Sequence, residues 1–113
     1  MKIKLKKKIL SNPKKIEKLL LSEIITEFEN KSEVQNIYNQ IVKSINDIGF
    51  EETVIKFSIS NSKTKSGSLG WINKNSLSKN ILEELNDINV GEITRPILVS
   101  SGMLILKLNN KKL

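Results

Sequence analysis

The 113-residue chain contains no cysteine and no histidine. Without cysteine it can form neither a disulfide nor a thiolate nucleophile, which excludes disulfide-stabilised scaffolds and cysteine-based enzymes. Without histidine it lacks the commonest general base at neutral pH and the commonest metal ligand, so a histidine-dependent or zinc site is excluded and no cofactor is expected. No stretch reaches the roughly 18 consecutive apolar residues of a membrane span, and the amino-terminal segment lacks the apolar core of a signal peptide.

The net charge of +7 is distributed unevenly. Eight of the lysines lie within residues 1–18, and the rest of the chain is close to balanced. A basic surface is typical of proteins that bind nucleic acid, but no aromatic side chain is interleaved among these lysines to stack on bases. Because Asn12-Pro13 interrupts this segment, we interpret residues 1–18 as a basic tail or linker, or the end of a preceding domain. The chain is then expected to be a fragment of a longer protein.

The length allows one domain, and its first half predicts one strand followed by two helices. Residues 19–25 are apolar on both sides of a Ser-Glu pair, as in a central strand. Over residues 32–48 apolar side chains recur at intervals of three and four, with Ser32 as the expected N-cap and Gly49 as the terminating glycine. Residues 50–58 predict a short amphipathic helix, and the polar residues 61–66 predict a loop.

The second half is organised around Ser-Gly-Ser-Leu-Gly-Trp at residues 66–71, which predicts a strained turn that leads into a short strand over residues 69–72. A helix is expected over residues 79–88. Pro96 lies within a strand expected over residues 95–99, Ser100-Ser101-Gly102 predicts a hairpin turn, and residues 103–108 predict a final strand that is apolar enough to be central.

In this order and spacing, the pieces resemble the parvulin family of peptidyl-prolyl isomerases, whose pattern can be paraphrased as FxxLAxxYS, a loop, GGDLGW, a helix, GExSxPI and GxHII. The corresponding stretches here begin at Phe50, Ser66, Gly91 and Gly102. The resemblance implies an α+β fold over residues 19–111, in which helices surround a mainly antiparallel four-stranded sheet. Among parvulins, the chain looks most similar to the SurA/PpiC-like folding factors of the bacterial periplasm.

The resemblance also implies where the site lies. Parvulins surround a slot for the substrate proline with two histidines and a Cys or Asp, and these positions fall on Glu23, Leu104 and Ser60. Ser60 and Glu23 are therefore the candidate catalytic residues, although Glu23 is also interpretable as a strand residue turned to solvent or paired with a lysine. The candidate substrate-binding residues are the family's apolar lining and rim: Leu69, Leu77, Ile81, Val99, Ser101 and Leu104.

The sequence leaves three functions open, of which the first two are implied by the resemblance and the third by the lysine-rich residues 1–18. The first is a parvulin-like module that binds unfolded or extended polypeptide, with outer-membrane proteins among its clients, and has a degenerate active site, because the polar network is replaced while the apolar lining is kept. The second is an active peptidyl-prolyl isomerase that works through the apolar slot and Ser60. The third is a basic nucleic-acid-binding domain. The resemblance implies a periplasmic parent protein; without it, a cytoplasmic location is expected.

Overall fold

The computed structural model describes residues 16–113, and within them four strands form a single sheet in the order β3-β2-β5-β4. Every neighbouring pair is antiparallel. The strands are β2 (Lys18–Thr26), β3 (Ser68–Asn73), β4 (Ile97–Val99) and β5 (Gly102–Lys112). The α+β class, the antiparallel sheet and the central positions of β2 and β5 are confirmed.

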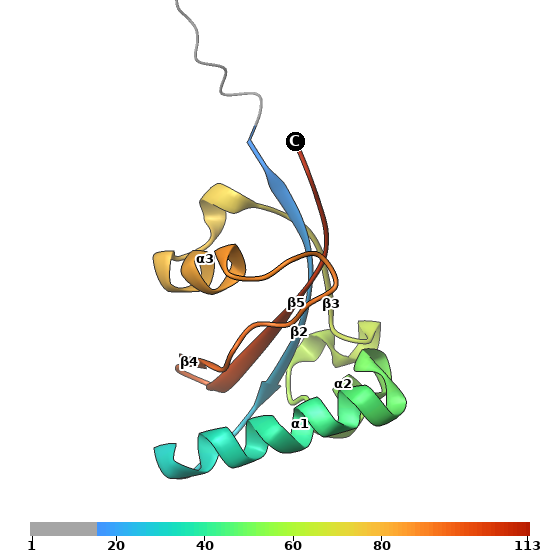
Figure 1. Ribbon diagram of the computed structural model, residues 1–113, viewed down its shortest axis with the longest axis vertical. Coiled ribbons are helices and arrows are strands. Elements are labelled where there is room, and N and C mark those ends of the chain that lie inside the picture. The colour runs from blue at the N-terminus through green and yellow to red at the C-terminus, as the bar shows by residue number, and fades with distance from the viewer. Residues whose placement is uncertain (1–15) are drawn as a thin grey trace, which may run out of the picture.

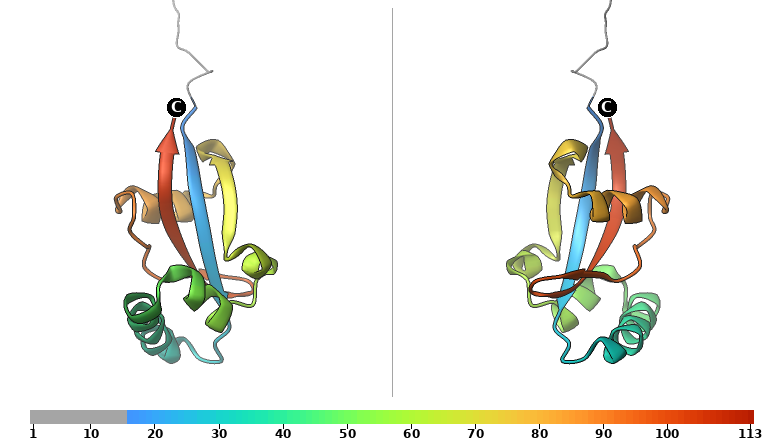
Figure 2. Two further views of the ribbon diagram at one scale, coloured as in Figure 1. Left: turned by 90° about the vertical axis from the view of Figure 1, so that its right-hand side faces the viewer. Right: turned by 90° about the vertical axis from the view of Figure 1, so that its left-hand side faces the viewer.

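The helices cover the two faces of this sheet. Helices α1 (Val34–Ile48) and α2 (Phe50–Phe57) pack against one face of the sheet, near one of its ends. Helix α3 (Lys79–Asn86) lies against the opposite face (Figure 1). In the right-hand view of Figure 2, α3 crosses in front of β2 and β5. None of the helices among the described residues is both long and apolar enough to cross a membrane.

Strand alternation divides the core into two apolar clusters, because residues directly opposite each other in an antiparallel pair point to the same face. On the α3 face, Leu21 lies opposite Leu108 and Ile25 opposite Leu104. Leu85 of α3 is buried in the same cluster. On the other face, the strands contribute three buried side chains and α1 and α2 contribute three more: Ile24, Met103, Ile105, Ile41, Phe50 and Val54.

Two local predictions in the first half are wrong. Ser32 does not cap α1; it lies inside a 3-10 helix, Lys31–Glu33, and α1 begins at Val34. The turn starts early because the Glu33 carboxylate accepts hydrogen bonds from the backbone N–H groups of Glu29 and Asn30, at 3.0 and 3.5 Å. The predicted loop at residues 61–66 also contains a 3-10 helix, Asn61–Lys65.

The strand boundaries near the carboxyl terminus differ from the prediction in both directions. β4 has three residues instead of five, because Pro96 has no N–H to donate to a ladder. β5 continues to Lys112, where it pairs with the start of β2 beyond a register shift. Helix α3 ends at Asn86, two residues earlier than expected. Residues 1–15 of the predicted basic tail lie outside the described residues.

Candidate functional site

The connection between α2 and β3 borders the candidate site, because it occupies the edge of β2 beyond Ser22, where β3 no longer pairs. The N–H of Ile25 donates to the Ser58 hydroxyl at 3.1 Å, and the N–H of Ile59 donates to the Ile25 carbonyl at 2.8 Å. Further along, the N–H of Glu23 donates to the Gly67 carbonyl at 2.8 Å. These bonds hold residues 58–67 beside the second half of β2.

Gly67 permits this close approach. Its φ is +86°, and a Cβ at this position would lie 2.6 Å from the Glu23 carbonyl oxygen and 2.9 Å from Cγ2 of Val54. Ser66, just before it, is in the left-handed region with φ of 56°. The strained turn predicted at residues 66–71 is therefore confirmed, and its role is to bring the connection against the backbone of β2.

Glu23 lies on the same face of the sheet as the apolar cluster beneath α3, because it is directly opposite Leu106 in β5. Its side chain is buried, with 9% of its surface exposed. One carboxylate oxygen, Oε2, accepts hydrogen bonds from the hydroxyls of Ser60 and Ser62, the latter at 2.7 Å. The interpretation of Glu23 as a residue turned to solvent or paired with a lysine is wrong, because the connection above it supplies hydroxyl donors and covers it.

The three side chains form a hydrogen-bonded group that we call the Glu23 cluster: Glu23, Ser60 and Ser62. The Ser60 hydroxyl has one hydrogen, which it donates to Glu23, while its oxygen accepts from the Ser62 N–H at 3.3 Å. The cluster can therefore accept a hydrogen bond from a ligand N–H, but a hydroxyl must leave Glu23 before it can donate to a ligand carbonyl. Ser62 was not predicted, and its only signal in the sequence is the alternation of serines at positions 58, 60 and 62.

Four of the six predicted substrate-binding residues come together on the α3 face. Leu104 is buried within the apolar cluster, and Leu77, Ile81 and Val99 are half-buried and pack against it. Leu69, in β3, leaves 36% of its surface exposed and is not grouped with them. These four residues therefore belong to one apolar cluster on the α3 face, and their role in peptide binding stays a prediction.

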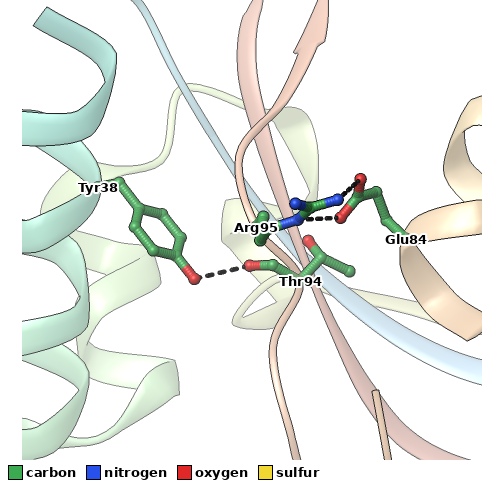
Figure 3. Close-up of polar contacts among 4 residues, drawn as sticks. All are labelled: Tyr38, Glu84, Thr94 and Arg95. Atoms are coloured by element: carbon green, nitrogen blue, oxygen red, sulfur yellow. Dashed lines mark hydrogen bonds and ion pairs between the residues drawn. The ribbon is translucent and has the colours of Figure 1, made fainter. Parts of the chain in front are cut away.

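Two polar contacts link the segment just before β4 to helices α3 and α1 (Figure 3). Arg95, just before β4, donates two hydrogen bonds to the Glu84 carboxylate of α3, at 3.1 and 2.8 Å. The Tyr38 hydroxyl of α1 donates to the Thr94 carbonyl at 2.9 Å. The bond to Glu84 raises the pKa of Arg95, and burial raises the pKa of Tyr38 above its ordinary value of 10.0.

A hollow of about 590 Å³ adjoins the site at the far end of β2. One side is the loop that follows β2, which contributes Glu27, Phe28, Glu29 and Glu33. The other side is the β4–β5 turn, which contributes Val99 and Ser101 together with Ser100 and Gly102. Two predicted substrate-binding residues, Val99 and Ser101, therefore line an open space. Ser101 is exposed at its rim.

Comparison with known proteins agrees with the order of elements described above. The family model for rotamases, the PPIC-type PPIase domain, matches residues 5–110. The chain is 32% identical over 79 residues to the chaperone SurA of Pseudomonas putida, covering 70% of this chain, and 33% identical over 92 residues to the chaperone SurA of Buchnera aphidicola, covering 80%. It spans about a fifth of the length of these relatives, 18% and 21% respectively.

Solved structures share the fold. A PpiC-type peptidyl-prolyl cis-trans isomerase domain superimposes with a TM-score of 0.70 at 21% identity, over 86% of this chain and 93% of that one. The isomerase PrsA of Bacillus anthracis gives a TM-score of 0.70 at 24% identity, over 86% of this chain and 43% of that one. A structure described as two SurA-like chaperones of Campylobacter jejuni gives 0.69 at 22% identity, over 87% and 40%.

Proposed function

Because this chain belongs to the PPIC-type peptidyl-prolyl isomerase family, we propose that it is mainly a polypeptide-binding module, of the kind found in chaperones, with weak or no isomerase activity. The supporting observation is the exchange of polar for apolar groups on the α3 face. Leu104, at a position that the family resemblance assigns to histidine, is packed among Leu77, Ile81 and Val99. This face can hold apolar side chains of an extended polypeptide by burying them from water.

Catalysis requires more than this surface. Rotation about an X-Pro bond has a barrier near 20 kcal/mol, because the amide loses its resonance. Groups that favour the twisted amide over the planar one lower that barrier. Here both hydroxyls of the Glu23 cluster donate to Glu23, and Leu104 offers no hydrogen bond. Substrate binding is therefore expected to persist while the acceleration of rotation is small.

A protease-coupled assay on a proline-containing peptide tests the catalytic part of the proposal. We expect a rate far below that of an ordinary parvulin assayed in parallel. Glu23→His combined with Leu104→His is expected to recover some activity, limited by Ser60 and by Ser68 in the glycine-rich turn. A rate comparable to an ordinary parvulin for the unaltered chain would overturn the proposal and favour the active isomerase, for which the buried Glu23 cluster is the supporting feature.

Peptide binding is tested separately by titrating labelled protein with hydrophobic and proline-containing peptides and following amide shifts. The proposal predicts shifts at Leu77, Ile81 and Leu104. No shift at these residues with any peptide would remove the binding function. Shifts confined to lysines before residue 18 and abolished by moderate salt would instead mean that the peptides bind electrostatically to the basic segment, since exposed charges are screened by salt.

For the parent protein we propose a role in protein folding outside the cytoplasm, with outer-membrane proteins among its clients. The support is similarity: the curated relatives are named chaperones, and the Campylobacter jejuni structure is described as including a periplasmic protein. Within the predicted linker, residues 1–18, Lys18 lies in β2 and Glu17 pairs with Lys74 at 3.2 Å. We therefore propose residues 1–15 as the linker to the rest of that protein. Fractionation of cells that produce the full-length parent, followed by detection in the periplasm or the cytoplasm, tests the location.

A further inference from the structure

The hollow between the loop after β2 and the β4–β5 turn has walls of two kinds. Its apolar walls are Phe28, which is half-buried and packs against the second apolar cluster, and Val99 of the candidate site. Its charged lining is acidic throughout: Glu27, Glu29 and Glu33 contribute carboxylates, and no lysine or arginine lines it. An aliphatic stem that ends in a positive charge fits both kinds of wall, because Lys and Arg bury their methylene groups and keep the charged head at a polar rim.

We propose that this hollow gives the polypeptide-binding site its specificity, by holding a Lys or Arg side chain of an extended peptide whose apolar neighbours lie against the α3 face. The inference rests on the proposed function: Val99 both lines the hollow and packs against the apolar cluster, so one extended peptide can reach both. The volume of about 590 Å³ exceeds the space of one such side chain and leaves room for part of an aromatic or proline neighbour.

Charge complementarity selects this occupant over an acidic or neutral one. Residues 19–113 carry eleven positive and eleven negative side chains, so this part of the chain has no net charge of its own. The negative charge of the hollow is therefore a local feature and does not reflect the net charge of residues 19–113. Glu27 and Glu29 are exposed, and within residues 16–113 the Glu29 carboxylate makes no hydrogen bond. Glu33 differs, because it accepts hydrogen bonds from the backbone of its own loop.

The experiment titrates the whole chain with three extended peptides that share Phe and Pro and differ at one adjacent position, which is Arg, Gln or Glu. We expect the Arg peptide to bind best, with amide shifts at Phe28, Val99 and Ser101, and its advantage over the Gln peptide to shrink as salt rises. The double variant Glu27→Gln, Glu29→Gln should weaken the Arg peptide by about three- to tenfold and leave the Gln peptide unchanged.

The matched control is Glu51→Gln, Glu52→Gln on α2, which removes the same charge from exposed positions outside the hollow. The control should bind all three peptides as the unaltered chain does. Equal loss of Arg-peptide binding in both double variants would mean that total charge, not the hollow, is recognised, and would overturn the inference. Preference for the Glu peptide, or protein that self-associates through this hollow without peptide, would also overturn it.

The outcome separates the inference from the function on which it rests. If the Gln and Arg peptides bind equally with shifts at Leu77 and Leu104, polypeptide binding stands and the specificity is refuted. If no peptide produces shifts at either set of residues, both fail. Glu33 is left unaltered throughout, because its loss would disturb the loop and would confuse a change of shape with a change of charge.

Discussion

Replacing Glu23 by leucine is expected to leave the domain about as stable as it is now, whereas replacing it by alanine should destabilise it. Glu23 interrupts a stripe of buried apolar residues on the α3 face: Leu19 and Leu21 precede it in β2, and Leu106 lies opposite. A buried carboxylate is costly to remove from water, and apolar replacements of similar volume are often neutral or stabilising. A leucine at position 23 should therefore stabilise the domain about as well as the carboxylate does.

The magnitude follows from what each replacement removes and adds. Both variants lose two hydrogen bonds to a carboxylate, each contributing about 1.5–3 kcal/mol, but they also remove its desolvation cost, which is several kcal/mol. Leucine then buries an apolar side chain, which contributes about 1.5–3 kcal/mol, and alanine leaves a cavity instead. We expect Glu23→Leu to lie within about 1 kcal/mol of the unaltered chain and Glu23→Ala to be about 2–3 kcal/mol less stable.

Urea unfolding measures both free energies. With a slope of about 1–3 kcal/mol per molar urea, a difference of 2 kcal/mol between the variants moves the midpoint by about 1 M. Glu51→Leu and Glu51→Ala, at an exposed position of α2, are the matched controls and should differ from each other by less than about 0.5 kcal/mol. If Glu23→Leu loses as much stability as Glu23→Ala, the hydrogen bonds of the carboxylate stabilise the fold more than its burial costs, and the expectation that leucine can replace it is refuted.

Two further predictions concern contacts that hold the site in place. Gly102→Ala should lower the free energy of unfolding by more than about 2 kcal/mol, because a Cβ there would lie 2.3 Å from the Thr26 carbonyl oxygen. The control is Gly70→Ala, where no atom lies within 4 Å of the added Cβ. It should lower the free energy of unfolding by about 1 kcal/mol, because alanine is strained at the positive φ of this position. Equal losses in urea unfolding would contradict this. Tyr38→Phe should lower the free energy of unfolding by about 1 kcal/mol at neutral pH, because it removes the hydrogen bond to the Thr94 carbonyl. Because burial raises the pKa of Tyr38, the unfolded chain ionises first, so the advantage of tyrosine should be full below pH 10.0 and fall above it; an advantage that grows above pH 10 would refute this assignment.

Local patterns were enough for most of the fold. Helix α1 was predicted from apolar residues that recur every three or four positions, and its end from Gly49, which has a φ of 90°. The centrality of β5 followed from its unbroken apolar run, because a strand with both faces covered has no solvent side. The errors lie at element ends, such as Ser32 and Pro96, where one side-chain hydrogen bond or one missing N–H decides the boundary.

The candidate site divides in the same way. The sequence by itself determined which groups are available: no histidine, apolar residues such as Leu77 and Leu104, and a strained glycine turn before β3. Only the tertiary structure decided that Glu23 is buried beneath two serines and that the loop after β2 meets the β4–β5 turn in an acidic hollow. The physical reason is distance along the chain. Glu23 is 39 residues from Ser62, and such contacts depend on how the whole sheet is paired, which no local periodicity encodes.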